Sequence, residues 1–435
     1  MWKPLLHSFP RAILHVDGDA FFVGCEVARD PSLRGKCVVT GKERGIASAL
    51  SYEAKRKGVT RGMKISDVLK VCPDAIILPS DYESYSLYSK RMYEIVRRYT
   101  PDVEEYSIDE CFADLTGLRR TFRMPYPKIA ERIKHDLQNE LGITFSVGLG
   151  PTKVLAKVAS KWKKPDGLTV ISGKHIEKYL KNLPTIKVWG IGPNTSAYLE
   201  KYGVRTALEF IQKEEWWIKD KVSKPYHEIW HELRGVVMYP IVTGVKREYK
   251  SISKTKTFTP PSTEREFVFS QLSKNIENAC IKARRHGLIS KKVFFYLKTQ
   301  SFDYAGLEVK LSHPVGIPLE IVTVARQCFD ELFHQGVPYR ATGVVLMDLI
   351  PNKESQQDLF GETLKIDSVS HIYKTVDALA DKFGKHTVFL GSSFKAITDP
   401  QHRGERGVLS HRVTNRLKGE SKRQHLSIPL LGEVR

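Results

Sequence analysis

Two adjacent carboxylates, Asp109 and Glu110, lie between two runs of strand-forming residues. Residues 103–108 and 111–115 are rich in β-branched, aromatic and small apolar side chains, which favours a hairpin with both acids at its turn. Carboxylates held over one small volume repel each other, and a bound cation offsets that repulsion. The hairpin therefore predicts part of a site for a hard divalent cation.

A third carboxylate, Asp17, stands where an apolar strand over residues 12–17 ends, and Gly18, Phe21 and Phe22 follow it. Acids at strand ends are often simple turn formers, and that is the common explanation for a single aspartate. Three carboxylates on neighbouring strand ends instead suit Mg²⁺, which prefers oxygen ligands and completes its shell with water and phosphate. Two such ions about 3.5–4 Å apart can serve the attacking and leaving oxygens of a phosphoryl transfer.

The charge balance points to a polyanionic partner. The chain has 435 residues, with 69 Lys and Arg against 49 Asp and Glu, a formal net charge of +20. Because the excess is spread over several segments, it fits nucleic acid better than a membrane surface, although a merely basic protein is the alternative. The first residues lack the apolar core of a signal peptide, and no apolar run reaches about 18 residues, so we expect a cytoplasmic protein without a membrane anchor.

The cysteines never approach a Cys-x-x-Cys spacing. This usage predicts reduced core residues rather than zinc ligands or disulfides. The six are Cys25, Cys37, Cys72, Cys111, Cys280 and Cys328.

The segments His15–Phe22 and Tyr106–Glu110 closely resemble the two signature motifs of the Y-family translesion DNA polymerases. The similarity is particular to DNA polymerase IV and to the catalytic subunit of bacterial polymerase V, and it extends in matching order and spacing over roughly residues 11–365. The resemblance implies a template-directed, low-fidelity polymerase in DNA damage tolerance. Such an enzyme transfers a nucleotide from dNTP to the primer 3′-hydroxyl with two Mg²⁺ ions, here held by Asp17, Asp109 and Glu110 with assistance from the Gly18 carbonyl.

The same resemblance implies an α+β multidomain fold, a right-hand polymerase with a ferredoxin-like palm, small fingers, a helical helix-hairpin-helix thumb and a β-α-β-β-α-β little finger. The expected parts are palm at 1–31 and 81–178, fingers at 32–80, thumb at 179–243, a linker at 244–250, little finger at 251–350, a clamp-binding loop at 351–365, and a C-terminal helix with a basic, flexible tail at 366–435.

Residue patterns support parts of this plan directly. Apolar periodicity predicts helices from Asp81 onward and over 127–141, and both are expected to cover one face of the palm sheet. In the little finger, Thr263 to Glu266 have the pattern of a capping box that opens a helix ending near Gly287.

The resemblance also assigns the nucleotide site. Phe22, beside Phe21, is the expected steric gate, because an aromatic ring beneath the sugar leaves no room for a 2′-hydroxyl. Tyr52 and Lys55 are expected to contact the triphosphate. Lys55 departs from the arginine that is usual in the polymerase IV branch, and a lysine loses the bidentate fork that matches phosphate.

A third triphosphate contact is expected from the helix after residue 151. Lys153, Lys157 and Lys161 recur every four residues and therefore form one stripe beside the carboxylates. The resemblance assigns the triphosphate to Lys157. An ordinary solvated helix face is the alternative for Lys161 and Lys163.

Two further segments suggest contacts with primer-template DNA. Gly190 and Gly192 lie between two short helices, where their small size lets backbone N–H groups approach a phosphate, although Gly-x-Gly alone is weak support. Lys254 and Lys256 alternate with small polar residues on the first expected strand of the little finger, so one strand face can meet phosphates without reading bases.

Beyond the little finger, Gln356, Leu359 and Phe360 stand in a polar loop. They resemble the peptide by which bacterial polymerases dock on the β sliding clamp, with a hydrogen-bonding glutamine and an apolar pair that fills a pocket. Two other functions stay open: a non-catalytic DNA- and clamp-binding homologue, and a nucleotide cyclase built on a similar palm. The lesions bypassed and any requirement for accessory subunits are also open.

Overall fold

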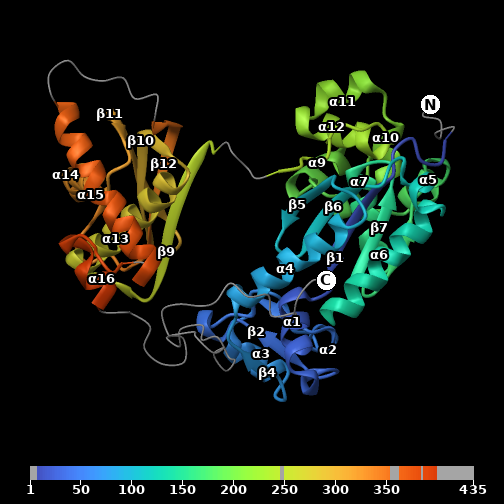
Figure 1. Ribbon diagram of the computed structural model, residues 1–435, viewed down its shortest axis with the longest axis horizontal. Helices are drawn as coiled ribbons and strands as arrows, with labels where there is room; N and C mark the ends of the chain where they lie inside the picture. Colours follow the sequence, from blue (N-terminus) through green and yellow to red (C-terminus); the bar gives the residue numbers. More distant parts are fainter. Residues whose placement is uncertain (1–6, 245–248, 353–361, 384–385, 399–435) are drawn as a thin grey trace. The chain divides into compact units, whose positions relative to one another are not determined.

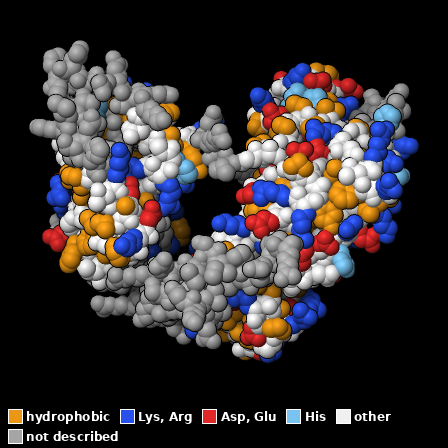
Figure 2. All heavy atoms as spheres, viewed as in Figure 1, with side chains coloured by type: hydrophobic (Ala, Val, Ile, Leu, Met, Phe, Trp, Pro, Cys, Tyr) orange, Lys and Arg blue, Asp and Glu red, His pale blue; other side chains and the backbone are white. Residues whose placement is uncertain are grey.

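The computed structural model describes residues 7–244, 249–352, 362–383 and 386–398 (Figure 1). The chain forms two compact units that divide at residue 244, inside the expected linker. The first unit contains a five-stranded sheet, a three-stranded sheet and a group of short helices, and the second contains a four-stranded sheet with its helices. Lys and Arg side chains occur on both units on the face shown in Figure 2.

The five-stranded sheet corresponds to the expected palm and has the strand order β5-β6-β1-β7-β8. Its first four strands are antiparallel and have the order of a ferredoxin-like sheet, and β8 adds in parallel to β7. The two acids fall at the turn between β5 and β6, so the expected hairpin is confirmed. The strands are β1 (Ile13–Gly18), β5 (Val103–Ser107), β6 (Glu110–Asp114), β7 (Phe145–Gly150) and β8 (Leu168–Val170).

Helices cover both faces of this sheet, whereas the sequence pattern placed them on one. Helices α4 (Tyr82–Arg97) and α6 (Tyr126–Leu141) pack on the face that carries Leu14 and Val16, as expected. Helix α7 (Lys153–Trp162) packs on the other face against β1 and β7. Gly148 allows this approach, because a Cβ there would lie 2.0 Å from the carbonyl oxygen of Ala156.

The fingers form a small three-stranded sheet with short helices. Strand β2 (Val38–Thr40) lies between β3 (Ala49–Leu50) and the parallel β4 (Ile76–Leu78). Helices α2 (Tyr52–Arg56) and α3 (Ile65–Val71) pack beside it, and α1 (Phe21–Arg29) joins the fingers to the palm. The core has few buried side chains: Cys37, Val39, Ala47, Leu50, Ala54, Val59, Val68 and Cys72.

Short helices form the thumb of the first unit. A 3₁₀ helix over Thr185–Lys187 leads through Gly190 to Gly192, and α9 begins at Pro193. Gly190 has φ +92° and would place a Cβ 2.6 Å from the Ile229 side chain, so a glycine is required there. The helices are α8 (Ile176–Leu180), α9 (Pro193–Lys201), α10 (Ala207–Gln212), α11 (Glu215–Lys221) and α12 (Lys224–Leu233).

The second unit has the expected β-α-β-β-α-β order, with strand order β11-β10-β12-β9. Its elements are β9 (Ser251–Ser262), α13 (Arg265–Arg285), β10 (Leu288–Thr299), β11 (Tyr304–Val315), α14 (Pro318–Leu332) and β12 (Tyr339–Pro351). Helix α15 (Glu362–Phe383) starts earlier than the sequence indicated and is tied to α13 by Arg284, whose guanidinium binds the Asp377 carboxylate at 2.7 Å. A short helix, α16 (Phe394–Thr398), follows.

The capping box predicted at Thr263 is wrong. Helix α13 begins at Arg265, and Glu264 is its N-cap without a capping side-chain hydrogen bond. Strand β9 runs on to Ser262, so Thr263 and Glu264 form the turn, and the Glu264 N–H donates to the Ser262 hydroxyl at 3.1 Å. Among the described residues, no helix combines the length and apolarity needed to cross a bilayer.

Candidate active site

Strand register brings the three carboxylates together. Asp17 on β1 is paired with Glu110 on β6, and the Gly18 N–H donates to the Asp109 carbonyl at 2.8 Å. The hairpin turn is therefore fixed to the end of β1. Asp17, Gly18, Asp109 and Glu110 all line one pocket of about 440 Å³ between palm and fingers.

Glu110 is held in its ionised form by two buried partners. Its Oε2 accepts from the Lys157 ammonium at 2.5 Å and lies 3.2 Å from His15 Nε2. Burial alone would raise the pKa of Glu110, but the hydrogen bonds from His15 and Lys157 outweigh it and lower the pKa to about 2. His15 is fully buried, which lowers its pKa to about 4, and its Nδ1 lies 2.7 Å from the Ser160 hydroxyl.

The pKa of Asp17 is shifted in the opposite direction, upward. Burial raises the pKa of this carboxyl to about 6, even though the Lys164 ammonium contacts it directly, and the charges of Glu110 and Asp109 add to the rise. The protein's own groups therefore leave the Asp17 anion incompletely compensated. A cation among the three carboxylates would supply the missing positive charge, so this donor set fits a divalent metal.

Asp19 is also buried, but its oxygens are already engaged. It accepts from the Ser146 hydroxyl and the Asp166 N–H, both at 2.8 Å, and from the Tyr52 hydroxyl at 3.3 Å. Asp19 thus ties β7, the loop after α7 and the fingers to the end of β1. We interpret it as a structural anchor for the pocket.

The expected steric gate lies on an aromatic support. The Phe22 ring stacks on Tyr85 with centroids 4.5 Å apart and meets Tyr82 edge to face at 5.3 Å. The Tyr85 hydroxyl donates to the buried Glu26 at 2.6 Å. Phe21 and Phe22 both line the pocket, as do Tyr52 and Lys55 from the fingers. Lys55 Nζ lies 4.4 Å from the centre of the Tyr52 ring.

Lys157 does not line this pocket. Its ammonium is 4.5 Å from the Tyr106 ring centre and 5.0 Å from that of Trp189, and the residue is 5% exposed. Lys153, also buried, binds Glu104 at 2.7 Å. The predicted lysine stripe divides: Lys153 and Lys157 face the sheet and its acids, whereas Lys161, one turn further along α7, is exposed.

Sequence reasoning missed two basic residues that do line the pocket, Lys164 and Arg61. Lys164 was part of the basic run at the end of α7, and nothing in that run distinguished it from its neighbours. Its partner Asp17 is 147 residues away, so only the fold reveals the pair.

The expected DNA contacts lie outside this pocket. Gly190 and Gly192 precede α9 in the thumb. Lys254 and Lys256 lie on edge strand β9 and share its face with Ile252, which is buried in the core of the second unit. Lys256 is exposed and Lys254 is half-buried. The proposed clamp residues Gln356, Leu359 and Phe360 lie outside the described residues.

Comparisons with known proteins show the family of this chain. The impB/mucB/samB family model matches residues 16–161, and the model of its C-terminal domain matches residues 249–359. DNA polymerase IV of Moorella thermoacetica is 32% identical over 385 residues, covering 87% of this chain and 94% of the relative. DNA polymerase IV of Desulfatibacillum aliphaticivorans is 30% identical over 379 residues, covering 86% of this chain and 95% of that relative.

Solved structures share the fold. A Y-family DNA polymerase chimera matches with a TM-score of 0.67 and 23% identity over 78% of this chain and 100% of that one. An insertion ternary complex of Dbh DNA polymerase matches with a TM-score of 0.52 and 24% identity over the same shares. Sheet order, pocket and relatives lead to one conclusion: the chain belongs to the Y family of DNA polymerases and is a translesion DNA polymerase similar to DNA polymerase IV.

Proposed function

We propose that Asp17, Asp109 and Glu110 hold two Mg²⁺ ions, with the Gly18 carbonyl as an additional ligand, for nucleotidyl transfer. Y-family polymerases use divalent metal ions, and the observation that carries this proposal is the convergence of the three carboxylates on one pocket, where the charge of Asp17 is incompletely compensated. When bound, the ions supply the Lewis acidity that favours a primer 3′-oxyanion and that offsets charge on the departing pyrophosphate. The 3′-oxygen forms its bond to the α-phosphorus as the bond to pyrophosphate breaks.

The chain's own residues position the reactants. Phe22 selects a deoxyribose by occupying the space that a 2′-hydroxyl would need, and Tyr85 holds the Phe22 ring in place. Tyr52 and Lys55 bind the triphosphate from the fingers. Lys164 takes the triphosphate role that the sequence assigned to Lys157, because Lys164 lines the pocket and Lys157 does not.

Lys157 then has a different task. At 2.5 Å from Glu110 Oε2, it keeps this carboxylate ionised and oriented toward the ions. Since its ammonium is buried between Tyr106 and Trp189, it cannot leave without opening the contact between palm and thumb. Lys157 is thus a positioning residue.

Primer-template DNA and dNTP are the proposed ligands. The Gly190–Gly192 segment would bind duplex phosphates through backbone N–H groups and Lys256 through its exposed charge. Gln356, Leu359 and Phe360 would dock on a β sliding clamp, a proposal that rests on the sequence alone. A cytoplasmic location stays a prediction, and whether accessory subunits are required stays open.

Primer extension tests the catalytic proposal. The wild type is given Mg²⁺ and four dNTPs on undamaged and abasic templates. Beside it are tested an Asp109→Ala/Glu110→Ala variant and an Asp102→Ala control, whose residue directly precedes β5. We expect metal-dependent extension by wild type and control, and none by the double variant. DNA binding without extension, even with a clamp present, would favour the non-catalytic alternative.

A further inference from the structure

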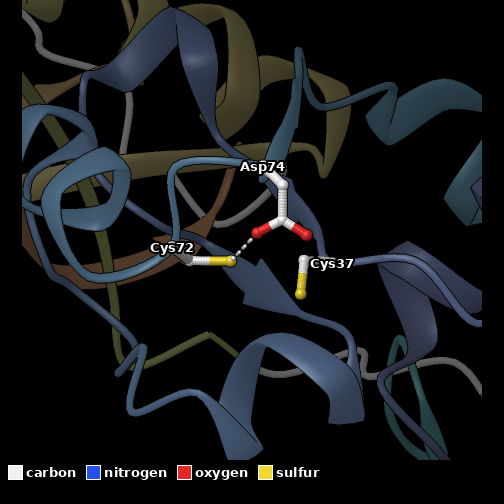
Figure 3. A group of neighbouring side chains, drawn as sticks. All are labelled: Cys37, Cys72 and Asp74. Atoms are coloured by element: carbon white, nitrogen blue, oxygen red, sulfur yellow. Dashed lines mark hydrogen bonds between the residues drawn. The ribbon is translucent and has the colours of Figure 1, made fainter.

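Two cysteines and an aspartate converge in the fingers, outside the polymerase site (Figure 3). Cys37 directly precedes β2, Cys72 ends α3, and Asp74 lies in the turn that leads to β4. Their two sulfur atoms and a carboxylate oxygen all lie within 4.8 Å of one another. The Cys72 thiol donates to Asp74 Oδ1 at 3.3 Å.

The three ligand atoms lie close enough together to converge on one tetrahedral ion. Zn–S bonds of about 2.3 Å and Zn–O bonds of about 2.0–2.2 Å place the ligand atoms of one ion about 3.5–3.8 Å apart. We propose that Cys37, Cys72 and Asp74 bind Zn²⁺ through two thiolates and one carboxylate. On binding, each thiol releases its proton to water and each sulfur donates an electron pair to the ion.

The surroundings provide an entry path and a balancing charge. Cys37 and Asp74 line an open pocket of about 550 Å³, which gives access from solvent and leaves room for a water as fourth ligand. The Lys57 ammonium binds both Asp74 oxygens, at 2.7 and 2.8 Å. Two thiolates, a carboxylate and Zn²⁺ carry a net charge of −1, which Lys57 neutralises.

The ion would stabilise a domain that has little core of its own. Cys37 and Cys72 are two of the eight buried residues in the fingers core. An ion bound there links the start of β2 to the end of α3. Small domains whose buried core stabilises them only weakly often depend on such a metal cross-link. Both cysteines are free and buried in the core, as predicted, and the proposal departs from that prediction only by assigning them a metal. The sequence concealed the site because 34 residues separate the two cysteines.

Cobalt substitution identifies the ligands. Reduced, metal-free protein is titrated with Co²⁺, and the near-ultraviolet charge-transfer band of Co²⁺–thiolate bonds is recorded. Oxygen and nitrogen ligands do not produce this band, so neither the palm carboxylates nor the Glu215, His227 and His231 group in the thumb interferes. The variants are Cys37→Ser, Asp74→Asn and, as a control cysteine in the second unit, Cys328→Ser.

We expect the band in wild type and in Cys328→Ser, and its loss in Cys37→Ser. In Asp74→Asn, the affinity for Co²⁺ should weaken about tenfold or more. Zn²⁺ should raise the melting temperature of wild type but not of Cys37→Ser. Because the Asp74 side chain is exposed, its variant should fold even where a cysteine variant fails. A wild type without the band, a band unaffected by Asp74→Asn, or a Cys37–Cys72 disulfide in freshly purified protein would overturn the proposal.

Discussion

The ring of Phe22 lies parallel to that of Tyr85, with 4.5 Å between centroids and 14° between planes. Tyr85 is fully buried and is itself held by the Glu26 carboxylate. The pocket wall that we propose to face the nucleotide sugar therefore rests on a chain of three side chains, which runs from Phe22 into the core.

Removing the Phe22 ring should relax sugar selection. With Phe22→Ala the space beneath the sugar opens, so we expect discrimination against ribonucleotides to fall by about 1–3 kcal/mol, or 10- to 200-fold. The measurement is kcat/KM for dNTP against rNTP in single-nucleotide insertion, with Phe9→Ala as a remote aromatic control. Unchanged discrimination would remove Phe22 from the site.

The Tyr85 hydroxyl should matter for stability. In Tyr85→Phe the buried Glu26 carboxylate loses a 2.6 Å donor, so the free energy of unfolding should fall by about 1–3 kcal/mol. Chemical denaturation of the first unit measures the change. Tyr88→Phe is the matched control on α4, because its hydroxyl makes no hydrogen bond among the described residues. Equal losses in both variants would contradict this account.

Glu232 should be needed to attach the thumb to the palm. Its carboxylate accepts from the N–H groups of Val154, Met238 and Tyr239 at 3.1, 2.7 and 2.9 Å. An amide keeps only one acceptor oxygen, so Glu232→Gln should lower the free energy of unfolding by about 1–3 kcal/mol. Glu228→Gln on the same helix serves as the control. A Glu232→Gln protein as stable as wild type in thermal unfolding would rule out this role.

The two lysines near the carboxylates should differ kinetically. Lys164→Ala removes a charge from the pocket wall and should raise KM for dNTP about tenfold, whereas Lys157→Met should lower kcat with little change in KM. Steady-state insertion kinetics separate the two effects, and Lys163→Ala is the neighbouring control. A larger KM effect from Lys157→Met would return the triphosphate role to Lys157.

Much of the fold follows from local patterns. The hairpin, the helix capped by Thr152 and the β-α-β-β-α-β order of the second unit are set by periodicity and turn residues over short distances. The capping box at Thr263 failed because pairing with β12 extends β9 to Ser262, and tertiary pairing outweighs a local cap signal.

The site was only partly predictable for the same reason. Asp17, Asp109 and Glu110 could be identified because three carboxylates at neighbouring strand ends suit a divalent cation. Lys164 and Glu232 do not stand out, since their partners are distant in sequence. Whether the α7 lysines point toward the sheet depends on which face of α7 packs against it. Gly148 allows α7 to pack closely on the sheet face opposite α4, and nothing near α7 in the sequence indicates this contact.

Metal binding tests the central claim most directly. Mn²⁺ binding is followed by electron paramagnetic resonance in the presence of primer-template DNA and a non-hydrolysable dNTP, for wild type and for Asp109→Asn/Glu110→Gln. The account predicts two bound ions in the wild type and loss of tight binding in the variant, with DNA affinity retained. An unchanged stoichiometry in the variant would show that these carboxylates do not hold the catalytic metals.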